Sequence, residues 1–164
     1  LIGLVGSEMC MRDGGMAAAK GTTLAPYLLS AQLCTPVAGL VTSCFGWREH
    51  PISRQADFHK GVDIAAAQGT PVRAVLPGVV EQVGYNDSYG NYLVIRHSER
   101  LRTTYNHCSE ILAEEGEQLS RGDRIALVGS TGISTGPHLH FEIEVQGKKA
   151  DPLLSLEVSA YEEG

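Results

Sequence analysis

Short apolar runs separated by turn residues fill this chain from about residue 34 onward, and they limit the folds that it can adopt. The runs are rich in Val, Ile, Leu and Tyr, and they read GLVTSCF, VDIAA, TPVRAVLPGVVEQVGY, NYLVIRH, RTTYNHC, RIALVGS and HLHFEIEV. Between the first two, the segment GWREHPISRQADFHKG is rich in turn residues. Later in the chain, EILAEEGEQLSRGD is compatible with one helical turn. No stretch has the period of a long amphipathic helix. The pattern predicts a mainly β protein: a single antiparallel domain of sandwich or barrel-like form.

The size and composition of the chain suit one globular domain. Its 164 residues can form one ordinary core, and 43% hydrophobic and 20% charged residues are typical of such a domain. The net charge of −6, without a basic cluster, argues against a nucleic-acid partner. No apolar run approaches the ~18 residues of a membrane span, so we expect no membrane contact by this chain. The opening LIGLVG is compatible with the stub of a removed signal or anchor and equally with ordinary chain. The oligomeric state stays open.

The first 33 residues differ in pattern from the rest. GGMAAAKGTT has the composition of a linker, and LAPYLLSAQL is compatible with a short helix or an extended arm. We therefore predict an N-terminal linker or arm over residues 1–33, which could lie over a cleft, and the β domain over residues 34–164.

The four cysteines carry no metal or redox motif. Cys10, Cys34, Cys44 and Cys108 show no CxxC spacing, so neither a zinc ribbon nor a thioredoxin-like site is supported. Cys34 and Cys44 flank a short segment and could form a disulfide in an exported protein. Free, buried thiols are the alternative.

The run HLHFEIEV places two histidines side by side. Side chains alternate between the faces of a strand, so His138 and His140 point the same way, followed on that face by Glu142 and Glu144. The other face is apolar and belongs to the core: Leu139, Phe141, Ile143 and Val145. Two imidazoles on one polar face, next to a loop of Gly, Ser, Thr and Pro, indicate a metal site, because neutral imidazole is the commonest metal ligand.

The segment FHKGVDIAA supplies partners for such a site. His59 and Asp63 would lie ~13 Å apart on a straight strand, at ~3.3 Å per residue. They can share a metal if the backbone bends at Gly61, which is the residue best suited to a bend. Two imidazoles, one carboxylate and an open position are the pattern of catalytic zinc. One histidine of the pair at 138 and 140 is then spare and can move a proton or stabilise an oxyanion.

These residues give the chain a resemblance to the lysostaphin/LytM-type zinc peptidases, which cleave peptide bonds in bacterial peptidoglycan. The resemblance runs from about Ser43 to Leu153, some two-thirds of the chain. It is carried, in order, by SCFGWREHP, FHKGVDIAAAQGTPVRAVLPGVVEQVGYNDSYGNYLVIRH, TTYNHCSE, GDRIALVGSTGISTGPHLHFEI and GKKADP. So many matching segments in the same order make it specific, and it implies a LytM-type peptidase fold for residues 34–164.

The resemblance implies a five-residue active site. The family's zinc ligands fall on His59, Asp63 and His140, and its two histidines that do not bind zinc fall on His107 and His138. The implied activity is that of a zinc metalloendopeptidase, in which a metal-activated water attacks the peptide bond. His107 and His138 would then move the proton and stabilise the tetrahedral oxyanion. Which of the two is the base stays open.

Two other classes of protein share parts of this pattern. Catalytically silent scaffolds or amidase activators of the cell envelope have the same fold, but many have lost some of the five residues kept here. Glucose-type phosphocarrier domains have a similar β architecture and paired histidines, but they do not need the aspartate of HxxxD. The resemblance therefore favours an active hydrolase, secreted or in the cell envelope, with a peptidoglycan peptide as substrate. The chemistry of the cross-bridge is not encoded in any residue that can be interpreted.

Several other side chains can contribute to a site without a specific signal. Four aromatic residues could line a substrate groove or pack in turns: Trp47, Tyr85, Tyr89 and Tyr92. We expect His50 and His97 at the surface or in turns. Cys108 follows His107 and would point to the opposite face of the strand, so we expect it to pack rather than react.

Overall fold

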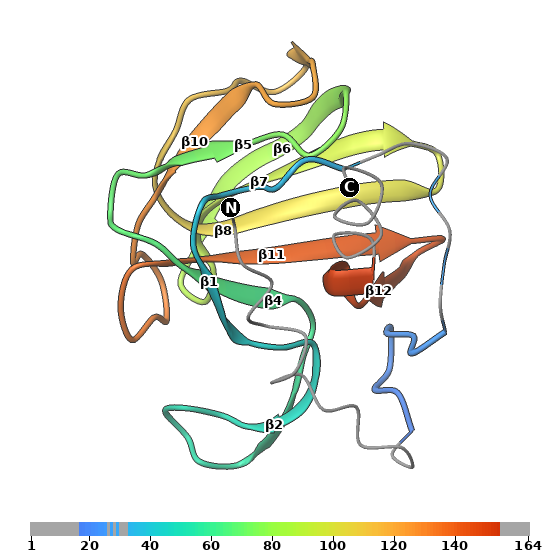
Figure 1. Ribbon diagram of the computed structural model, residues 1–164, viewed down its shortest axis with the longest axis vertical. Coiled ribbons are helices and arrows are strands. Elements are labelled where there is room, and N and C mark those ends of the chain that lie inside the picture. The colour runs from blue at the N-terminus through green and yellow to red at the C-terminus, as the bar shows by residue number, and fades with distance from the viewer. Residues whose placement is uncertain (1–16, 26, 28, 30–32, 155–164) are drawn as a thin grey trace, which may run out of the picture.

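The computed structural model describes residues 17–154 apart from 26, 28 and 30–32, and the regular secondary structure of this part is almost entirely β-strand (Figure 1). The strands are β1 Leu40–Ser43, β2 Gly46–Glu49, β3 Ala56–His59, β4 Val62–Ala65, β5 Pro71–Arg73, β6 Gly78–Asn86, β7 Gly90–Ser98, β8 Leu101–Ile111, β9 Gln118–Leu119, β10 Arg124–Val128, β11 His138–Val145 and β12 Lys148–Ala150.

One large antiparallel sheet carries most of the strands. Its main path runs β1-β4-β11-β8-β7-β6-β9, with β12 beside β11 and with β10 pairing both β8 and β5. The long strands β8 and β11 lie next to each other at its centre (Figure 1). β2 and β3 form a separate hairpin, which projects at the bottom of Figure 1. The predicted mainly β, antiparallel domain is confirmed.

The predicted alternation of β11 is also confirmed. Leu139, Phe141 and Ile143 are 0% exposed and belong to the hydrophobic core. Full burial of each such side chain stabilises the fold by roughly 1.5–3 kcal/mol. The other face of β11 carries His138 and His140. The core therefore fixes which face the histidines occupy, because a register slip of one residue would expose the apolar row.

The turn-rich segment GWREHPISRQADFHKG forms the β2–β3 hairpin, whose two strands were not among the predicted runs. Trp47 and Phe45 each pack edge-on against Phe58, with ring centroids 5.3 and 5.1 Å apart. Arg48 lies opposite Asp57 across the hairpin. Trp47 remains 43% exposed although Phe58 is buried, and the two strands lack the Val- and Ile-rich runs that marked the other strands.

The segment EILAEEGEQLSRGD contains no helix, so the expected helical turn was wrong. β8 continues to Ile111, and residues 118–119 form β9 against β6. Gly116 and Gly122 have φ angles of +83° and +87°. Both are left-handed conformations that interrupt a helix and favour glycine. Among the described residues, 152–154 are helical.

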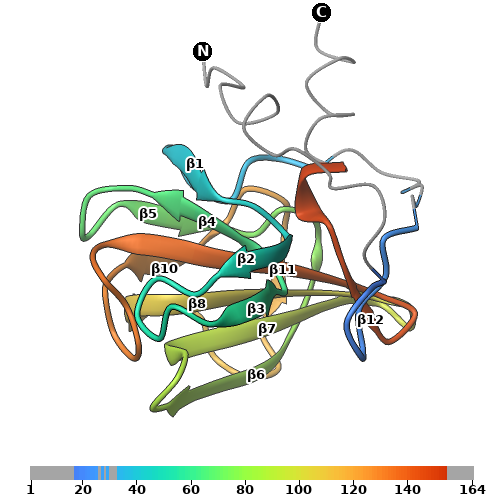
Figure 2. The same ribbon diagram turned by 90° about the horizontal axis from the view of Figure 1, so that it is seen from below.

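The described residues of the N-terminal segment contact the domain. Thr22 forms a bridge with Lys149 of β12, and Trp47 Nε1 donates to the carbonyl of Ala17 at 3.0 Å. Leu33 is 4% exposed and belongs to the core. Figure 2 shows this segment beside β12. The division at residue 33 stays a prediction. Residues 1–16, including LIGLVG, lie outside the described part, and no helix within that part is long and apolar enough to cross a membrane.

The cysteines differ from the suggested pairing. Cys44 is disulfide-bonded, whereas Cys34 and Cys108 are free thiols. The thiol of Cys34 lies 3.2 Å from the carbonyl of Ala74 instead. A Cys34–Cys44 disulfide is therefore ruled out. Cys108 is completely buried, as expected for a packing residue, and burial raises the pKa of its thiol to about 12.

Candidate active site

Three strands bring the predicted metal ligands together. His59 is the last residue of β3, Asp63 lies in β4, and His140 lies in β11 directly opposite Asp63. The chain bends at Gly61 between β3 and β4, as predicted. A Cβ atom at Gly61 would lie 2.3 Å from the carbonyl oxygen of Phe141. Glycine therefore lets the bend approach β11 closely enough for the three side chains to meet.

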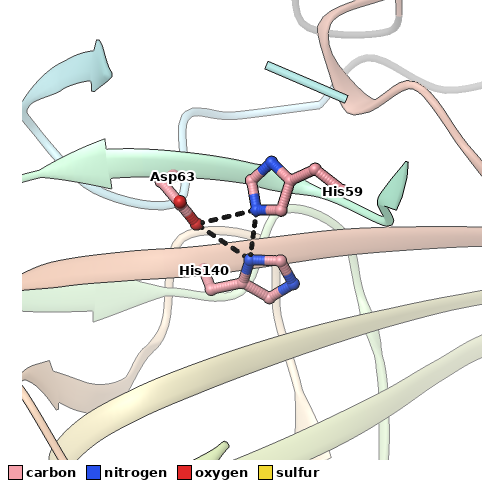
Figure 3. Close-up of side chains that lie close together, drawn as sticks. All are labelled: His59, Asp63 and His140. Atoms are coloured by element: carbon pink, nitrogen blue, oxygen red, sulfur yellow. Dashed lines mark hydrogen bonds and ion pairs between the residues drawn. The ribbon is translucent and has the colours of Figure 1, made fainter. Parts of the chain in front are cut away.

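The ligand atoms of these three residues form a small triangle (Figure 3). His59 Nε2 lies 3.1 Å from Asp63 Oδ1 and 3.0 Å from His140 Nδ1, and His140 Nδ1 lies 2.8 Å from Asp63 Oδ1. Both imidazoles are buried, at 4% and 6% exposure. Within the described residues, this is the group of His, Cys, Asp or Glu side chains whose ligand atoms could hold one metal ion.

Outer hydrogen bonds leave the right nitrogen of each imidazole for a metal. His59 Nδ1 lies 2.9 Å from the carbonyl of Cys44, and a carbonyl only accepts, so this nitrogen carries the proton. His140 Nε2 likewise lies 2.8 Å from the carboxylate of Glu142. The other ring nitrogens, His59 Nε2 and His140 Nδ1, then face Asp63. Metal-binding histidines commonly have such a hydrogen bond on the other ring nitrogen.

Charge in the site is concentrated on Asp63. Burial disfavours its ionised form, but hydrogen bonds with His140 and His59 outweigh burial and hold the pKa of Asp63 well below its usual range. Arg48 Nη1 lies 3.4 Å from Asp63 Oδ2, on the side away from the imidazoles. Asp63 is therefore ionised at neutral pH and offers an anionic oxygen to a cation.

The two histidines of the triangle differ in protonation. Burial lowers the pKa of His59, and its hydrogen bond with Asp63 offsets this in part. Burial also disfavours charge on His140, but hydrogen bonds with Asp63 and Glu142 outweigh it and raise the pKa of His140 to about 9. Without a cation, the two carboxylates therefore hold a proton on His140.

His107 reaches the same place from a distorted part of β8. Its φ angle is +63°, and the β7–β8 register shifts between Asn91 and Leu93, opposite this position. A bulge of this kind re-aims a side chain. His107 Nδ1 donates to the carbonyl of Thr131 at 2.7 Å, so Nε2 is unprotonated when the ring is neutral. Burial lowers the pKa of His107 to about 4, so the ring is neutral at pH 7.

His138 lies beside His107, with 4.8 Å between the ring centroids. Its Nδ1 donates to the carbonyl of Gly136 at 2.8 Å, and its Nε2 lies 3.7 Å from Asp63 Oδ1. The structure thus brings all five predicted residues together and separates them into two kinds. Three converge on one point, and two stand next to it with their Nδ1 atoms bonded to backbone carbonyls.

The five residues lie in an open cleft with a volume of about 380 Å³. The β2–β3 hairpin and the loop before β11 contribute much of its wall, including Arg48, His50, Ile52, Ile133, Ser134 and Thr135. Of the aromatic candidates, Tyr89 lines this cleft, and Tyr92 lines a neighbouring hollow. His97 lies elsewhere and bonds Pro77 and Thr103. A cleft that is open to solvent and lined by both polar and apolar side chains can accommodate an extended chain as ligand.

Comparison with known proteins gives a family match over residues 57–152, which include all five site residues. The matched description is peptidase family M23. The chain belongs to peptidase family M23.

Two curated relatives each match about two-thirds of this chain. An uncharacterized metalloprotease of Haemophilus influenzae is 46% identical over 65% of this chain and 22% of its own length. The DD-carboxypeptidase/endopeptidase Mpg of Neisseria meningitidis is 45% identical over 69% of this chain and 26% of its own length. This M23 chain therefore spans about a quarter of the length of these curated relatives.

Solved structures of similar proteins share the fold. A zinc-containing peptidase from Vibrio cholerae has a TM-score of 0.61 and 38% identity, over 69% of this chain and 37% of its own. The catalytic domain of lysostaphin from Staphylococcus simulans has a TM-score of 0.63 and 31% identity, over 69% of this chain and 90% of its own. These similarities confirm the expected lysostaphin/LytM-type fold of this M23 domain.

Several residues around the M23 site were not identified from the sequence. Arg48 bonds Asp63, and Lys149 bonds Glu142 at 2.9 Å. Each reaches its partner through tertiary contacts rather than through a sequence motif, so no local pattern indicated them. Glu142 was placed on the histidine face of β11 by strand alternation, but its hydrogen bond with His140 had no separate signal.

Proposed function

We propose that this chain is the catalytic domain of a zinc-dependent endopeptidase that cleaves peptide bonds in peptidoglycan. The arrangement of four histidines and one aspartate at the floor of the cleft carries this proposal. Two imidazoles and Asp63 direct ligand atoms at one point, and two further imidazoles keep an Nε2 lone pair beside it. Relatives described as peptidoglycan DD-endopeptidases, such as ShyC of Vibrio cholerae at 44% identity, support the choice of substrate.

His59, Asp63 and His140 would hold the zinc. Two neutral nitrogens and one carboxylate oxygen are a common donor set for catalytic zinc, and three protein ligands leave a position open. Their burial and their outer hydrogen bonds fit such an ion. When bound, zinc supplies a Lewis acid that lowers the pKa of water and polarises a carbonyl.

His107 and His138 would handle the protons. Each ring is fixed by its Nδ1–H bond to a backbone carbonyl, so Nε2 can accept a proton during attack on the scissile carbonyl. The same nitrogen can return that proton to the leaving amine. The carbonyls of Thr131 and Gly136 stabilise the positive ring meanwhile, and the protonated ring can stabilise the oxyanion.

The proposed place of action is outside the cytoplasm, in the cell envelope, because peptidoglycan is found there. The complete set of five convergent residues favours the enzyme over a catalytically silent scaffold of the same fold. A glucose-type phosphocarrier domain does not need a carboxylate such as Asp63 between two imidazoles, so this class is disfavoured. Peptidoglycan peptide is the proposed partner, and we assign no partner beyond it.

Digestion of a purified, cross-linked muropeptide tests the proposal. We expect the zinc-loaded chain to give products in which one peptide bond has gained a water, identified by mass spectrometry. A chelator should stop the reaction, and His59→Ala should give no product. Cleavage of the glycan instead of a peptide bond, or an intact muropeptide, would refute the proposed activity.

A further inference from the structure

A chain of hydrogen bonds leads from His140 to the edge of the sheet. His140 Nε2 lies 2.8 Å from Glu142 Oε1, and the other carboxylate oxygen, Oε2, lies 2.9 Å from Lys149 Nζ. The side chain of Glu142 is 5% exposed and that of Lys149 is 23% exposed. Each oxygen of one buried carboxylate thus has its own partner, one toward the active site and one away from it.

Glu142 alone would hold His140 weakly. A glutamate side chain has several rotatable bonds, and a buried carboxylate without a second partner is costly. Lys149 supplies that partner from β12 and fixes the plane of the carboxylate. Lys149 also lies 3.4 Å from Glu144 Oε2, so its ammonium group is placed between two carboxylates of β11.

The backbone of Lys149 is held on the side away from β11 by the N-terminal segment. Its N–H donates to the carbonyl of Gly21 at 2.9 Å, and its carbonyl accepts from the N–H of Thr23 at 2.8 Å. β12 is three residues long and pairs with β11 on its other side, so these two bonds place Lys149 between β11 and the N-terminal segment. The described part of the N-terminal segment therefore supports the outer end of the hydrogen-bond chain.

We propose that Lys149 is a positioning residue for the metal centre, acting on His140 through Glu142. The inference rests on the proposed metal site. By holding the carboxylate of Glu142 against His140 Nε2, Lys149 keeps the ring turned so that Nδ1 faces His59 and Asp63. Loss of an outer partner of this kind lowers metal affinity about 10–100-fold.

Zinc affinity, measured by competition with a chromophoric chelator, tests this without any need for turnover. We expect Lys149→Met to bind zinc about 10-fold or more weakly than the parent chain, while still binding one zinc at saturation. Lys149→Arg, which keeps a cation within reach of Glu142, should recover most of the affinity. The matched control is Lys148→Met, because Lys148 is the exposed neighbour in the same strand.

A double-mutant cycle separates positioning from a general loss of structure. In a Glu142→Gln background, the change Lys149→Met should lower zinc affinity little further, because the route to His140 is already broken. If Lys149→Met does not fold, Lys149→Gln enters the same cycle. Unchanged affinity in the lysine variant, an equal loss in Lys148→Met, or full additivity with Glu142→Gln would overturn the inference. A parent chain that binds zinc but cleaves no muropeptide would refute the proposed activity and leave the role of Lys149 intact.

Discussion

Hydrogen bonds to the outer ring nitrogens decide what each histidine of the site can do. The carbonyl of Cys44 and the carboxylate of Glu142 turn the other ring nitrogens of His59 and His140 toward Asp63. Backbone carbonyls fix His107 and His138 in the same way, but their free nitrogens lie beside the ligand triangle rather than at its corners. The same type of side chain is thus placed either to bind a metal or to move a proton, and its position relative to the ligand triangle decides which.

Removal of either histidine that lies outside the triangle should spare the metal and remove most activity. We expect His107→Ala and His138→Ala to lower turnover of a cross-linked muropeptide roughly 10²–10⁴-fold, because each removes a group positioned for proton transfer. Elemental analysis should still find one zinc per chain. Loss of zinc from either variant would show that the assigned roles are wrong, and His140→Ala is the positive control for such a loss.

Zinc binding should become weaker as the pH falls. The pKa of His140 is raised to about 9 without a cation, so its proton must leave when a metal binds Nδ1. Below that pKa, release of one proton makes the apparent affinity fall roughly 10-fold for each pH unit. Competition titrations between about pH 6 and 8 measure this slope.

The pH effect has an internal control in the same cleft. His50 lines the cleft without bonding the ligand triangle, so His50→Ala should leave the slope unchanged. An affinity that does not vary between pH 6 and 8 would contradict the protonated state assigned to His140. It would indicate that the metal-free ring is already neutral in this range.

At the scale of the elements, the bend between β3 and β4 builds the site. We expect Gly61→Ala to destabilise the metal-free chain by about 1–3 kcal/mol, because its Cβ would lie 2.3 Å from a carbonyl oxygen of β11. The same clash should separate Asp63 from His140 and weaken zinc binding. Chemical unfolding and a zinc titration measure the two effects.

Gly136→Ala is the matched control for the bend. A Cβ atom at Gly136 meets nothing within 4 Å, although the carbonyl of this residue bonds the site residue His138. We expect its stability and zinc affinity to stay close to those of the parent chain. If the two alanine variants behaved alike, close packing at Gly61 could not be what brings β4 and β11 together.

Strands with strong apolar patterns were predictable from sequence, and weakly buried ones were not. In β11 the alternation of Leu139, Phe141 and Ile143 with polar residues fixed both the strand and its faces. β2 and β3 were missed because they lack Val- and Ile-rich runs and instead pack Trp47, which is 43% exposed, against the buried Phe58. The bend at Gly61 was predictable because the pair His59 and Asp63 has a use only if the backbone turns between them.

At the scale of the whole molecule, long-range contacts complete the site. The triangle joins β3, β4 and β11, and its outer partners come from β2, from β12 and from the residue after β1. Strand alternation and the family resemblance indicated the five central residues. Arg48 and Lys149 could not be found this way, because their roles depend on strand pairings that neither segment encodes locally.

The role of the N-terminal segment is best tested by a truncation that leaves the core residues in place. Leu29 and Leu33 pack in or against the core, so deletion of residues 1–25 is the informative variant. We propose that residues 1–33 serve as a linker or arm rather than an inhibitor, and we expect the shortened chain to cleave muropeptide no faster than the parent. It should bind zinc more weakly, since Lys149 loses its bonds to Gly21 and Thr23.

A faster rate for the shortened chain would instead show that the segment inhibits the enzyme. A tethered segment can block a cleft at high effective concentration even when its intrinsic binding is weak. Addition of the separate peptide 17–25 in excess should then restore the slower rate. Failure of the shortened chain to fold would place these residues within the structural domain.

Restoration of activity by measured additions of zinc tests the central claim most directly, namely that this chain cleaves a peptide bond with one zinc ion bound at one site. Metal-free protein, prepared with a chelator, is mixed with a cross-linked muropeptide, and zinc is added in known steps. We predict that peptide-bond cleavage rises in proportion to the zinc added and levels off at one zinc per chain. Cleavage that survives complete removal of metal, or an intact muropeptide at one bound zinc per chain, would contradict the proposal.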